Sequence, residues 1–195
     1  MRINGVITED KKTGGMYAAA LFLLTLGIAA GSVYLVRSGK GTEIKEYLVS
    51  FFSSFAQNRN NTNVFKNSLT ANIVSALVIF LMGFFRFGCI GTGAVIIRKG
   101  FITGFTAASF LESYGTKGML IMLAGMPATI IAIPVMLFFA VISVRFSLNT
   151  GGKSKKLIFS YIFFLILTVS IFCVASLAEG YLTTTFMAWL SPKFT

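Results

Sequence analysis

Long apolar stretches constrain the fold of this chain more than any other feature. The first of them, residues 16–36, contains no charged residue. A helix of about 20 mostly apolar residues spans the roughly 30 Å of hydrocarbon in a bilayer. Because 55% of the residues are hydrophobic and only 12% are charged, the chain lacks the polar residues that would cover a soluble domain. We therefore expect an integral membrane protein.

Five such stretches predict an all-α, polytopic membrane protein that forms a single domain over residues 1–195. The predicted spans are residues 16–36, 70–88, 93–111, 118–144 and 157–178. A secretory signal peptide is the alternative for the first span, but the apolar region of a signal peptide is only about 7–15 residues long. An uncleaved anchor is therefore favoured.

The second and third spans are expected to form a helical hairpin. Gly88, Gly91 and Gly93 lie between them, and glycine is common where a helix breaks and turns. Two full crossings and a re-entrant pair both stay open for residues 72–114. In the fourth span, Pro127 and Pro134 each remove a backbone donor and are expected to kink the helix.

The basic residues predict an orientation. Arg86, Arg98 and Lys99 flank the expected hairpin tip, where their long side chains can carry the charge to the headgroups. With a cytoplasmic N-terminus, ten of the 17 Lys and Arg residues lie inside, as the positive-inside rule requires. We predict a multi-pass protein of the cell membrane with its N-terminus cytoplasmic, its C-terminus outside and these three charges on the cytoplasmic face.

An amphipathic helix is predicted in the loop after the first span, at residues 43–57. Its apolar residues share one helical face, and this face either packs on the protein's own spans or binds an extracytoplasmic partner. In the tail, the single Trp favours an interfacial anchor over a partner contact. The candidate partner contacts are Tyr47, Leu48, Phe51, Phe52, Phe55 and Trp189.

Small and amide residues indicate where spans approach one another. Gly27 and Gly31 form one G-x-x-x-G step, and Gly100 and Gly104 form another. This spacing lets helix backbones approach closely, either within the chain or at a dimer face. Asn67, like Asn72, is placed beside the start of the second span, where it could bond between spans or cap the helix.

Groups that could carry chemistry are few. The chain has no His, no pair of carboxylates at helical spacing within a span and no phosphate-binding G-x-x-x-x-G-K loop. Cys89 and Cys173 are interpreted as packing residues, and Glu112 and Glu179 as acids at span ends. Glu179 is also a candidate for a structural role between helices. We expect no catalytic residue, no cofactor, no metal and no nucleic-acid partner, so an enzyme or energy source would come from another chain.

Several segments, in their order and spacing, resemble one known family. The amphipathic segment 47–56 comes first, and a Ser-Pro pair closes the series. The segments between them are Phe65-Lys66-Asn67, Lys99-Gly100 with Gly104-Phe105-Thr106, Tyr114-Gly115, Pro127 with Ile133-Pro134, and an ending that fits S-L-x-E-x-Y-L and includes Glu179. Over nearly its whole length the chain resembles stage II sporulation protein M of endospore-forming bacteria.

That resemblance implies a role without catalysis. Members of the family act in the mother-cell membrane at the sporulation septum, during engulfment of the forespore. They form a complex with the peptidoglycan-degrading stage II sporulation proteins D and P. The chain is thus expected to be a membrane scaffold for peptidoglycan remodelling, and self-association into a homo-oligomer stays open.

Transport is the alternative function. Irregular helices at membrane depth often line a cavity, and the hairpin and the proline-containing span motivate a small permease or the membrane subunit of a transporter. A water-filled cavity lined by Arg86, Arg98 and Lys99 would favour transport. A dry interior packed with Phe would favour the scaffold.

Overall fold

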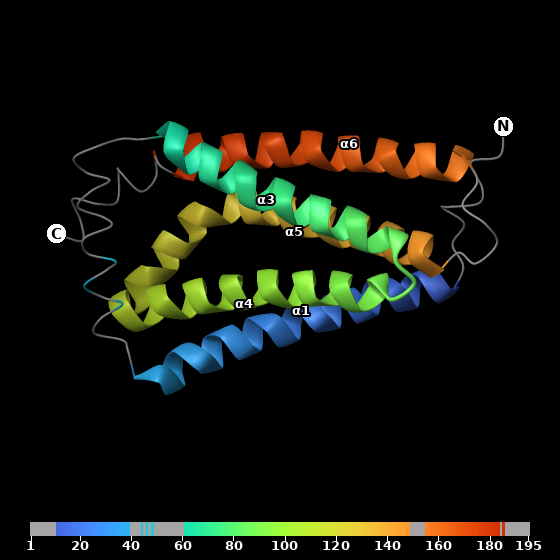
Figure 1. Ribbon diagram of the computed structural model, residues 1–195. Helices are drawn as coiled ribbons and strands as arrows, with labels where there is room; N and C mark the ends of the chain where they lie inside the picture. Colours follow the sequence, from blue (N-terminus) through green and yellow to red (C-terminus); the bar gives the residue numbers. More distant parts are fainter. Residues whose placement is uncertain are drawn as a thin grey trace.

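The computed structural model describes residues 11–39, 61–148 and 155–183, together with residues 44, 46, 48 and 185. The elements in these ranges are helical, which confirms the all-α prediction (Figure 1). They are α1 (Lys11–Ser38), α3 (Asn61–Phe84), α4 (Gly88–Tyr114), α5 (Thr116–Leu148), α6 (Lys155–Ala178) and the π-helical turn η1 (Glu179–Thr183).

The five long helices lie roughly alongside one another as a bundle (Figure 1). Each contains a stretch long and apolar enough to cross a membrane, so the predicted number of spans is confirmed. Together, α3 and α4 form two full-length helices and not a short re-entrant pair. We call the end that carries the α3–α4 connection the turn end, and the opposite end, where α6 passes into η1, the η1 end.

The α3–α4 turn lies earlier than the glycines predict. Residues 85–87 make the turn, and Gly88, Gly91 and Gly93 all belong to α4. A Cβ atom at Gly88 would collide with the backbone oxygen of Met82, and one at Gly91 would collide with the Met82 side chain. The first two glycines thus allow α4 to approach the end of α3 closely, and they are not the residues that reverse the chain.

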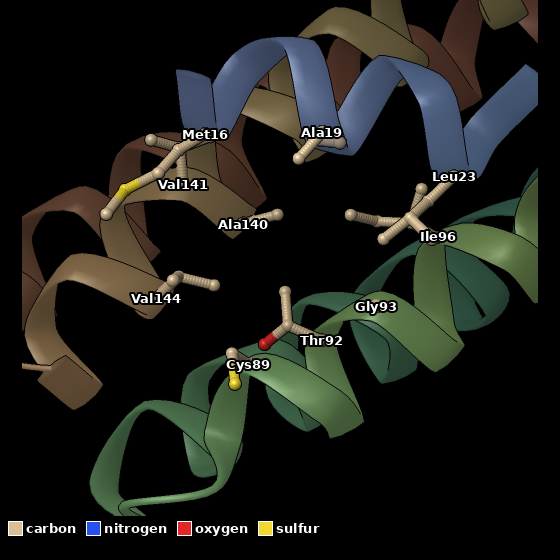
Figure 2. Close-up of a pocket in the computed structure, with 11 residues that line it drawn as sticks. Met16, Ala19, Leu23, Cys89, Thr92, Gly93, Ile96, Ala140, Val141 and Val144 are labelled. Atoms are coloured by element: carbon tan, nitrogen blue, oxygen red, sulfur yellow. The ribbon is translucent and has the colours of Figure 1, made fainter. Parts of the chain in front are cut away.

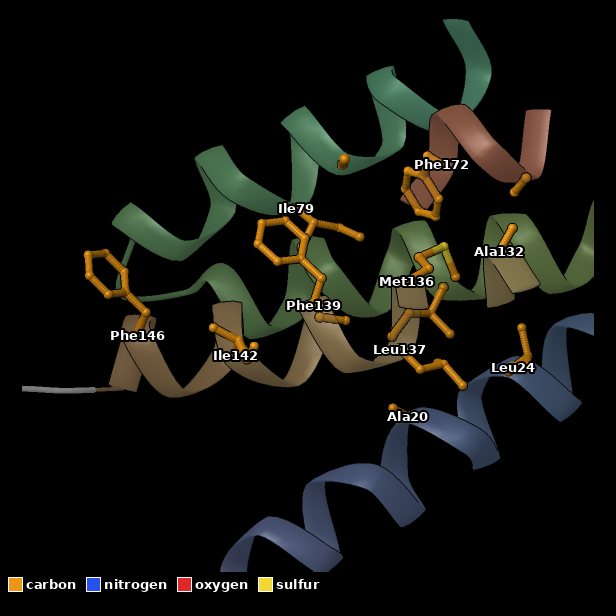
Figure 3. Close-up of a cluster of buried hydrophobic side chains, with 14 of the residues drawn as sticks. Ala20, Leu24, Ile79, Ala132, Met136, Leu137, Phe139, Ile142, Phe146 and Phe172 are labelled. Carbon is orange, nitrogen blue, oxygen red and sulfur yellow. The ribbon is translucent and has the colours of Figure 1, made fainter. Parts of the chain in front are cut away.

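The central helix of the bundle is α5. Half of its membrane-spanning window is buried inside the protein, against 28% or less in the other spans. Figure 3 shows Ile79 of α3, Phe172 of α6 and Leu24 of α1 around its buried side chains. The helix continues through Pro127 and Pro134. Its first part runs at an angle to the rest (Figure 1), and a bend of this kind is expected in a helix that contains proline.

Aromatic rings fill the space between α3, α5 and α6. Tyr161 is 2% exposed and stacks on Phe146 and Phe80, with ring centroids 4.3 and 4.8 Å away. Its hydroxyl donates to the backbone oxygen of Phe80 at 3.0 Å, and the hydroxyl of Ser143 donates to that of Ile79 at 2.7 Å. Each buried hydroxyl therefore has the acceptor that a membrane interior would not supply.

A glycine contact joins α1 to α4. Its members are Gly27, Gly31, Gly100 and Gly104. A Cβ atom at Gly27 would lie 2.5 Å from the backbone oxygen of Ile97, and one at Gly100 would lie 2.5 Å from that of Leu24. Across the same contact, Ser32 donates to the backbone oxygen of Gly104 at 3.2 Å. The two G-x-x-x-G steps thus pack against each other within one chain.

The contact between α1 and α4 predicts different effects on stability when a glycine of each helix is replaced by leucine. Gly104→Leu should lower the free energy of unfolding by about 3 kcal/mol, because the new side chain meets the backbone of Ile28. In the matched control, Gly14→Leu, the side chain enters open space. The gain in helix propensity is similar in both variants.

The measurement is the thermal unfolding midpoint of the purified chain in detergent. A clear decrease is expected for Gly104→Leu alone. Equal midpoints for the two variants would contradict the backbone contact between α1 and α4.

Candidate functional site

A hydrogen-bonded group of polar side chains lies inside the apolar bundle, between α3, α4, α6 and η1. We call it the polar cluster, and its members are Ser68, Asn72, Lys99, Ser176 and Glu179. Two of them, Asn72 at 5% and Ser176 at 0% exposure, are fully buried. Polar and ionisable groups inside a membrane are costly and mark functional sites, so the polar cluster is the candidate site.

Four hydrogen bonds link the polar cluster from end to end. The ammonium of Lys99 donates to Oδ1 of Asn72 at 3.2 Å, and Nδ2 of Asn72 donates to Oγ of Ser176 at 3.4 Å. The hydroxyls of Ser176 and Ser68 are 3.2 Å apart, and Ser68 donates to Oε2 of Glu179 at 2.5 Å. The chain of bonds therefore connects a cation on α4 to an acid on η1.

The number of protons that each group can donate decides which group is the donor in each of these bonds. An ionised carboxylate only accepts, and a serine hydroxyl has one proton to donate. Because the proton of Ser68 is given to Glu179, Ser176 must donate in the bond that the two hydroxyls share. Every donor then points from Lys99 towards Glu179, whose charge attracts the ammonium. Opposite charges and the four hydrogen bonds make this burial tolerable.

Local sequence spacing brings the members together. Ser68 and Asn72 are four residues apart on α3, and Ser176 and Glu179 are three residues apart across the α6–η1 junction. Side chains at these spacings share one helix face. Glu179 is the first residue of η1. Single π-helical turns are rare in proteins, and those that occur are often found at functional sites. Polar residues at these spacings are a signal that can be read from the sequence. They fit neither the pattern of a carboxylate pair nor that of a metal site.

The structure corrects the position of two predicted charges. Arg86 lies exposed in the α3–α4 turn, as expected, but Arg98 and Lys99 lie ten and eleven residues beyond Gly88. At 1.5 Å per residue they are about 15 Å along α4. Arg98 is exposed there, whereas Lys99 points to Asn72 inside the bundle. Arg98 and Lys99 therefore do not flank the α3–α4 turn, because the turn comes earlier than the glycines suggested.

The two amides also differ from expectation. Because α3 begins at Asn61, Asn67 lies within the helix and does not cap it, and its side chain is exposed. Of the two amides, only Asn72 bonds to side chains of other helices. Glu179 lies where α6 ends, as predicted for an acid at a span end, but it is half-buried and bonded to Ser68.

Of the predicted partner face, the structure describes only part. Residues 44, 46 and 48 are helical, and Leu48 is 8% exposed and packs with Ile44, Phe110 and Tyr114. Leu48 thus packs in the protein's own bundle, which is one of the two alternatives that the sequence left open for this face. The other predicted contacts lie outside the described residues: Tyr47, Phe51, Phe52, Phe55 and Trp189.

The polar cluster is suited to a structural role, which is to link helices to one another. Its members satisfy one another across three helices and η1, and they fix η1, which precedes the C-terminal tail, to α3 and α4. Within the described ranges, no three His, Cys, Asp or Glu side chains lie close enough together to hold a metal ion. The fold and the site define a five-span, all-α membrane protein with an internal polar joint.

Comparison with known families identifies the protein further. The sequence model of the family described as Stage II sporulation protein M matches residues 18–184, a range that includes the whole polar cluster. The chain belongs to this family, as its resemblance predicted, and is a sporulation-related membrane protein. Neither a curated protein nor a solved structure matches the chain.

The polar cluster predicts unequal roles for two serines of α6. Ser176→Ala should lower the free energy of unfolding by about 1–3 kcal/mol, because it leaves the buried amide of Asn72 without its acceptor. Ser170→Ala is the matched control. Ser170 is exposed and bonds the backbone oxygen of Ile166 in its own helix at 2.9 Å, so a change within about 0.5 kcal/mol is expected.

Unfolding of both variants by SDS in mixed micelles, followed by circular dichroism, gives the two free energies. If Ser176→Ala were as stable as Ser170→Ala, the polar cluster would not hold the helices together.

Proposed function

We propose that the chain is a non-enzymatic membrane scaffold of the sporulation septum. In this proposal it recruits stage II sporulation proteins D and P for peptidoglycan remodelling during forespore engulfment. The match of the family model to residues 18–184 carries the proposal. The scarcity of reactive groups supports it, since a chain without His and with 6 acidic residues offers little for general acid–base chemistry.

The geometry of the η1 end supports a holding role. Leu48 ties the segment after α1 to Phe110 and Tyr114 near the end of α4. The polar cluster ties η1, and with it the start of the C-terminal tail, to α3 and α4. Both attachments lie towards the same end of the bundle (Figure 1). A scaffold needs such segments held rigidly to its membrane-embedded part, so we assign partner binding to the η1 end.

Basic residues support an outward-facing η1 end. Arg86, Arg145, Lys155 and Lys156 lie at the turn end, in or next to the ends of α3, α5 and α6. Short basic connections tend to stay in the cytoplasm. We therefore infer that the turn end is cytoplasmic and that the η1 end faces the peptidoglycan, in the mother-cell membrane.

The second candidate, transport, has less support. Figure 2 shows a pocket between α1, α4 and α5 that is lined mostly by apolar side chains. Arg86, Arg98 and Lys99 are not among the side chains that line it. The space between α3, α5 and α6 is filled by aromatic rings. By the criterion set from the sequence, these observations favour a scaffold over a permease.

Orientation can be tested with single cysteines in a background that lacks Cys89 and Cys173. Phe87→Cys reports on the turn end, where Phe87 is 76% exposed, and Thr62→Cys reports on the exposed start of α3. A membrane-impermeant maleimide applied to intact cells should label Thr62→Cys and leave Phe87→Cys unlabelled until the cells are lysed. The reverse pattern would overturn the proposed orientation.

Partner recruitment can be tested on the amphipathic segment. Replacing Phe51 and Phe55 by Asp should remove an apolar contact face and release proteins D and P from the tagged chain in sporulating cells. The matched control, Asn58→Asp with Asn60→Asp, adds the same charge to the same loop. Membrane insertion should be equal in both double variants.

The measurement is co-isolation of proteins D and P with the solubilised chain. Unchanged recovery from the Phe51 and Phe55 variant would defeat this contact assignment. Failure to recover either protein with the unaltered chain would defeat the scaffold proposal itself.

A further inference from the structure

Arg98 is a cation that the polar cluster leaves out. Its side chain is exposed on α4, directly before Lys99, whose ammonium is attracted by Glu179. In the part of the chain that the structure describes, no group forms a hydrogen bond or an ion pair with the guanidinium of Arg98. The bundle thus presents an uncompensated positive charge on its surface.

This charge lies near the middle of the membrane. Exposed Arg86 and Lys155 mark the turn end, and exposed Glu112 marks the η1 end of α4, because such groups need headgroup water. At 1.5 Å per residue, Arg98 is about 15 Å from Gly88 and about 21 Å from Glu112, whereas the hydrocarbon is about 30 Å thick. A long cationic side chain reaches the headgroups from near a helix end, and Arg98 is far from both ends.

The surface of α4 around Arg98 carries no other charge. Residues four apart share a helix face, and we call this row the Arg98 stripe. Other faces of α4 meet the bundle, since Gly100 and Gly104 contact α1 and Ile96 belongs to the buried core. The members of the Arg98 stripe are all exposed, and they are Ile90, Ala94, Arg98, Ile102 and Thr106.

A carboxylate at the same depth would compensate this charge. An arginine and a carboxylate form two parallel hydrogen bonds, and their attraction is stronger where water is excluded. Charged side chains within membrane spans pair with one another for this reason. Lipid phosphates lie outside the hydrocarbon, so an acid at the depth of Arg98 belongs to a protein helix.

A second copy of this chain does not supply that carboxylate. Copies of one membrane protein share one orientation, so Glu112 of a second copy lies about 21 Å from the depth of Arg98. Glu179 is bonded to Ser68 and attracts Lys99. The remaining acids of the chain are outside the predicted spans, and they are Glu9, Asp10, Glu43 and Glu46. The carboxylate must therefore come from a different protein.

We infer that the Arg98 stripe binds a transmembrane helix of another protein that carries an Asp or Glu near its middle. The acid pairs with the guanidinium, Ile90 and Ile102 pack against apolar side chains of the partner helix, and Ala94 lets its backbone approach. This inference rests on the proposed scaffold function and deepens it, since it gives the scaffold a partner contact inside the membrane as well as at the η1 end.

The contact can be identified by photocrosslinking in sporulating cells. The photoreactive residue p-benzoylphenylalanine replaces Ile102, which is 48% exposed on the Arg98 stripe. In the matched control it replaces Ile166, which is 60% exposed on α6. After irradiation, the tagged chain is purified under denaturing conditions and the crosslinked peptides are sequenced by mass spectrometry.

The expected product at Ile102 is an apolar segment of another protein, about 20 residues long, with an Asp or Glu within about two helical turns of its centre. The control position should not give this product. A peptide from a second copy of this chain, a segment without an acid, or lipid adducts alone would overturn the inference.

The role of the charge is tested by variants of Arg98 in the same crosslinking experiment. Arg98→Leu should lower the yield at Ile102 by about tenfold or more, because it leaves the partner's acid unpaired. Arg98→Lys keeps the charge and should retain most of the yield. Lys156→Gln removes an exposed charge at the turn end and should leave the yield unchanged. Equal yields from Arg98→Leu and the unaltered chain would overturn the ion pair.

Stability of the isolated chain separates partner binding from a structural role. In detergent, Arg98→Leu should not lower the thermal unfolding midpoint, because the guanidinium bonds no described residue. A lower midpoint would show that Arg98 acts within its own chain. Exchange of the two charges, Arg98→Asp with the partner's acid changed to Arg, should restore the crosslink that either change alone removes. Failure of these tests would leave co-isolation of proteins D and P, which tests the scaffold function itself, unaffected.

Discussion

The absence of water in the bilayer is the constraint on which this structure depends. A polar group in the hydrocarbon must find its partner within the protein, because lipid tails offer none. The hydroxyls of Tyr161 and Ser143 meet this requirement by donating to backbone oxygens of α3. The polar cluster meets it with four linked bonds that end on opposite charges. These bonds tie α3 to α4, α5 and α6.

Close backbone approach is the second means by which the helices associate. Since lipid is as apolar as Leu, apolar burial alone gives little reason for one helix to prefer another. The glycines of α1 and α4 bring the two backbones into contact, so α1 is held by packing and by Ser32. The same use of small residues leaves the space beside Ala19 and Ala140. A tight contact and an open pocket thus both arise from small residues on neighbouring helices.

The sequence predicts some parts of this molecule well and others poorly. The number of spans follows from apolar length, which needs no knowledge of neighbours. The position of the α3–α4 turn does not, because Gly88 and Gly91 serve contact with Met82 and not the reversal of the chain. That single difference moved Lys99 from the expected headgroup level to the interior. Leu48 was likewise ambiguous, since an apolar face has the same pattern whether it meets the bundle or a partner.

By itself, the sequence determined the class of protein, the five spans and the family, because hydrophobic length and motif order are properties of the chain alone. Only the tertiary structure decided which polar residues act together. Ser68, Lys99 and Glu179 come from distant segments, and nothing in their local spacing says that α3, α4 and η1 meet. The physical reason is that a buried charge interacts with the groups that lie near it in the folded state. The number of residues between two groups in the sequence does not give their distance in the fold.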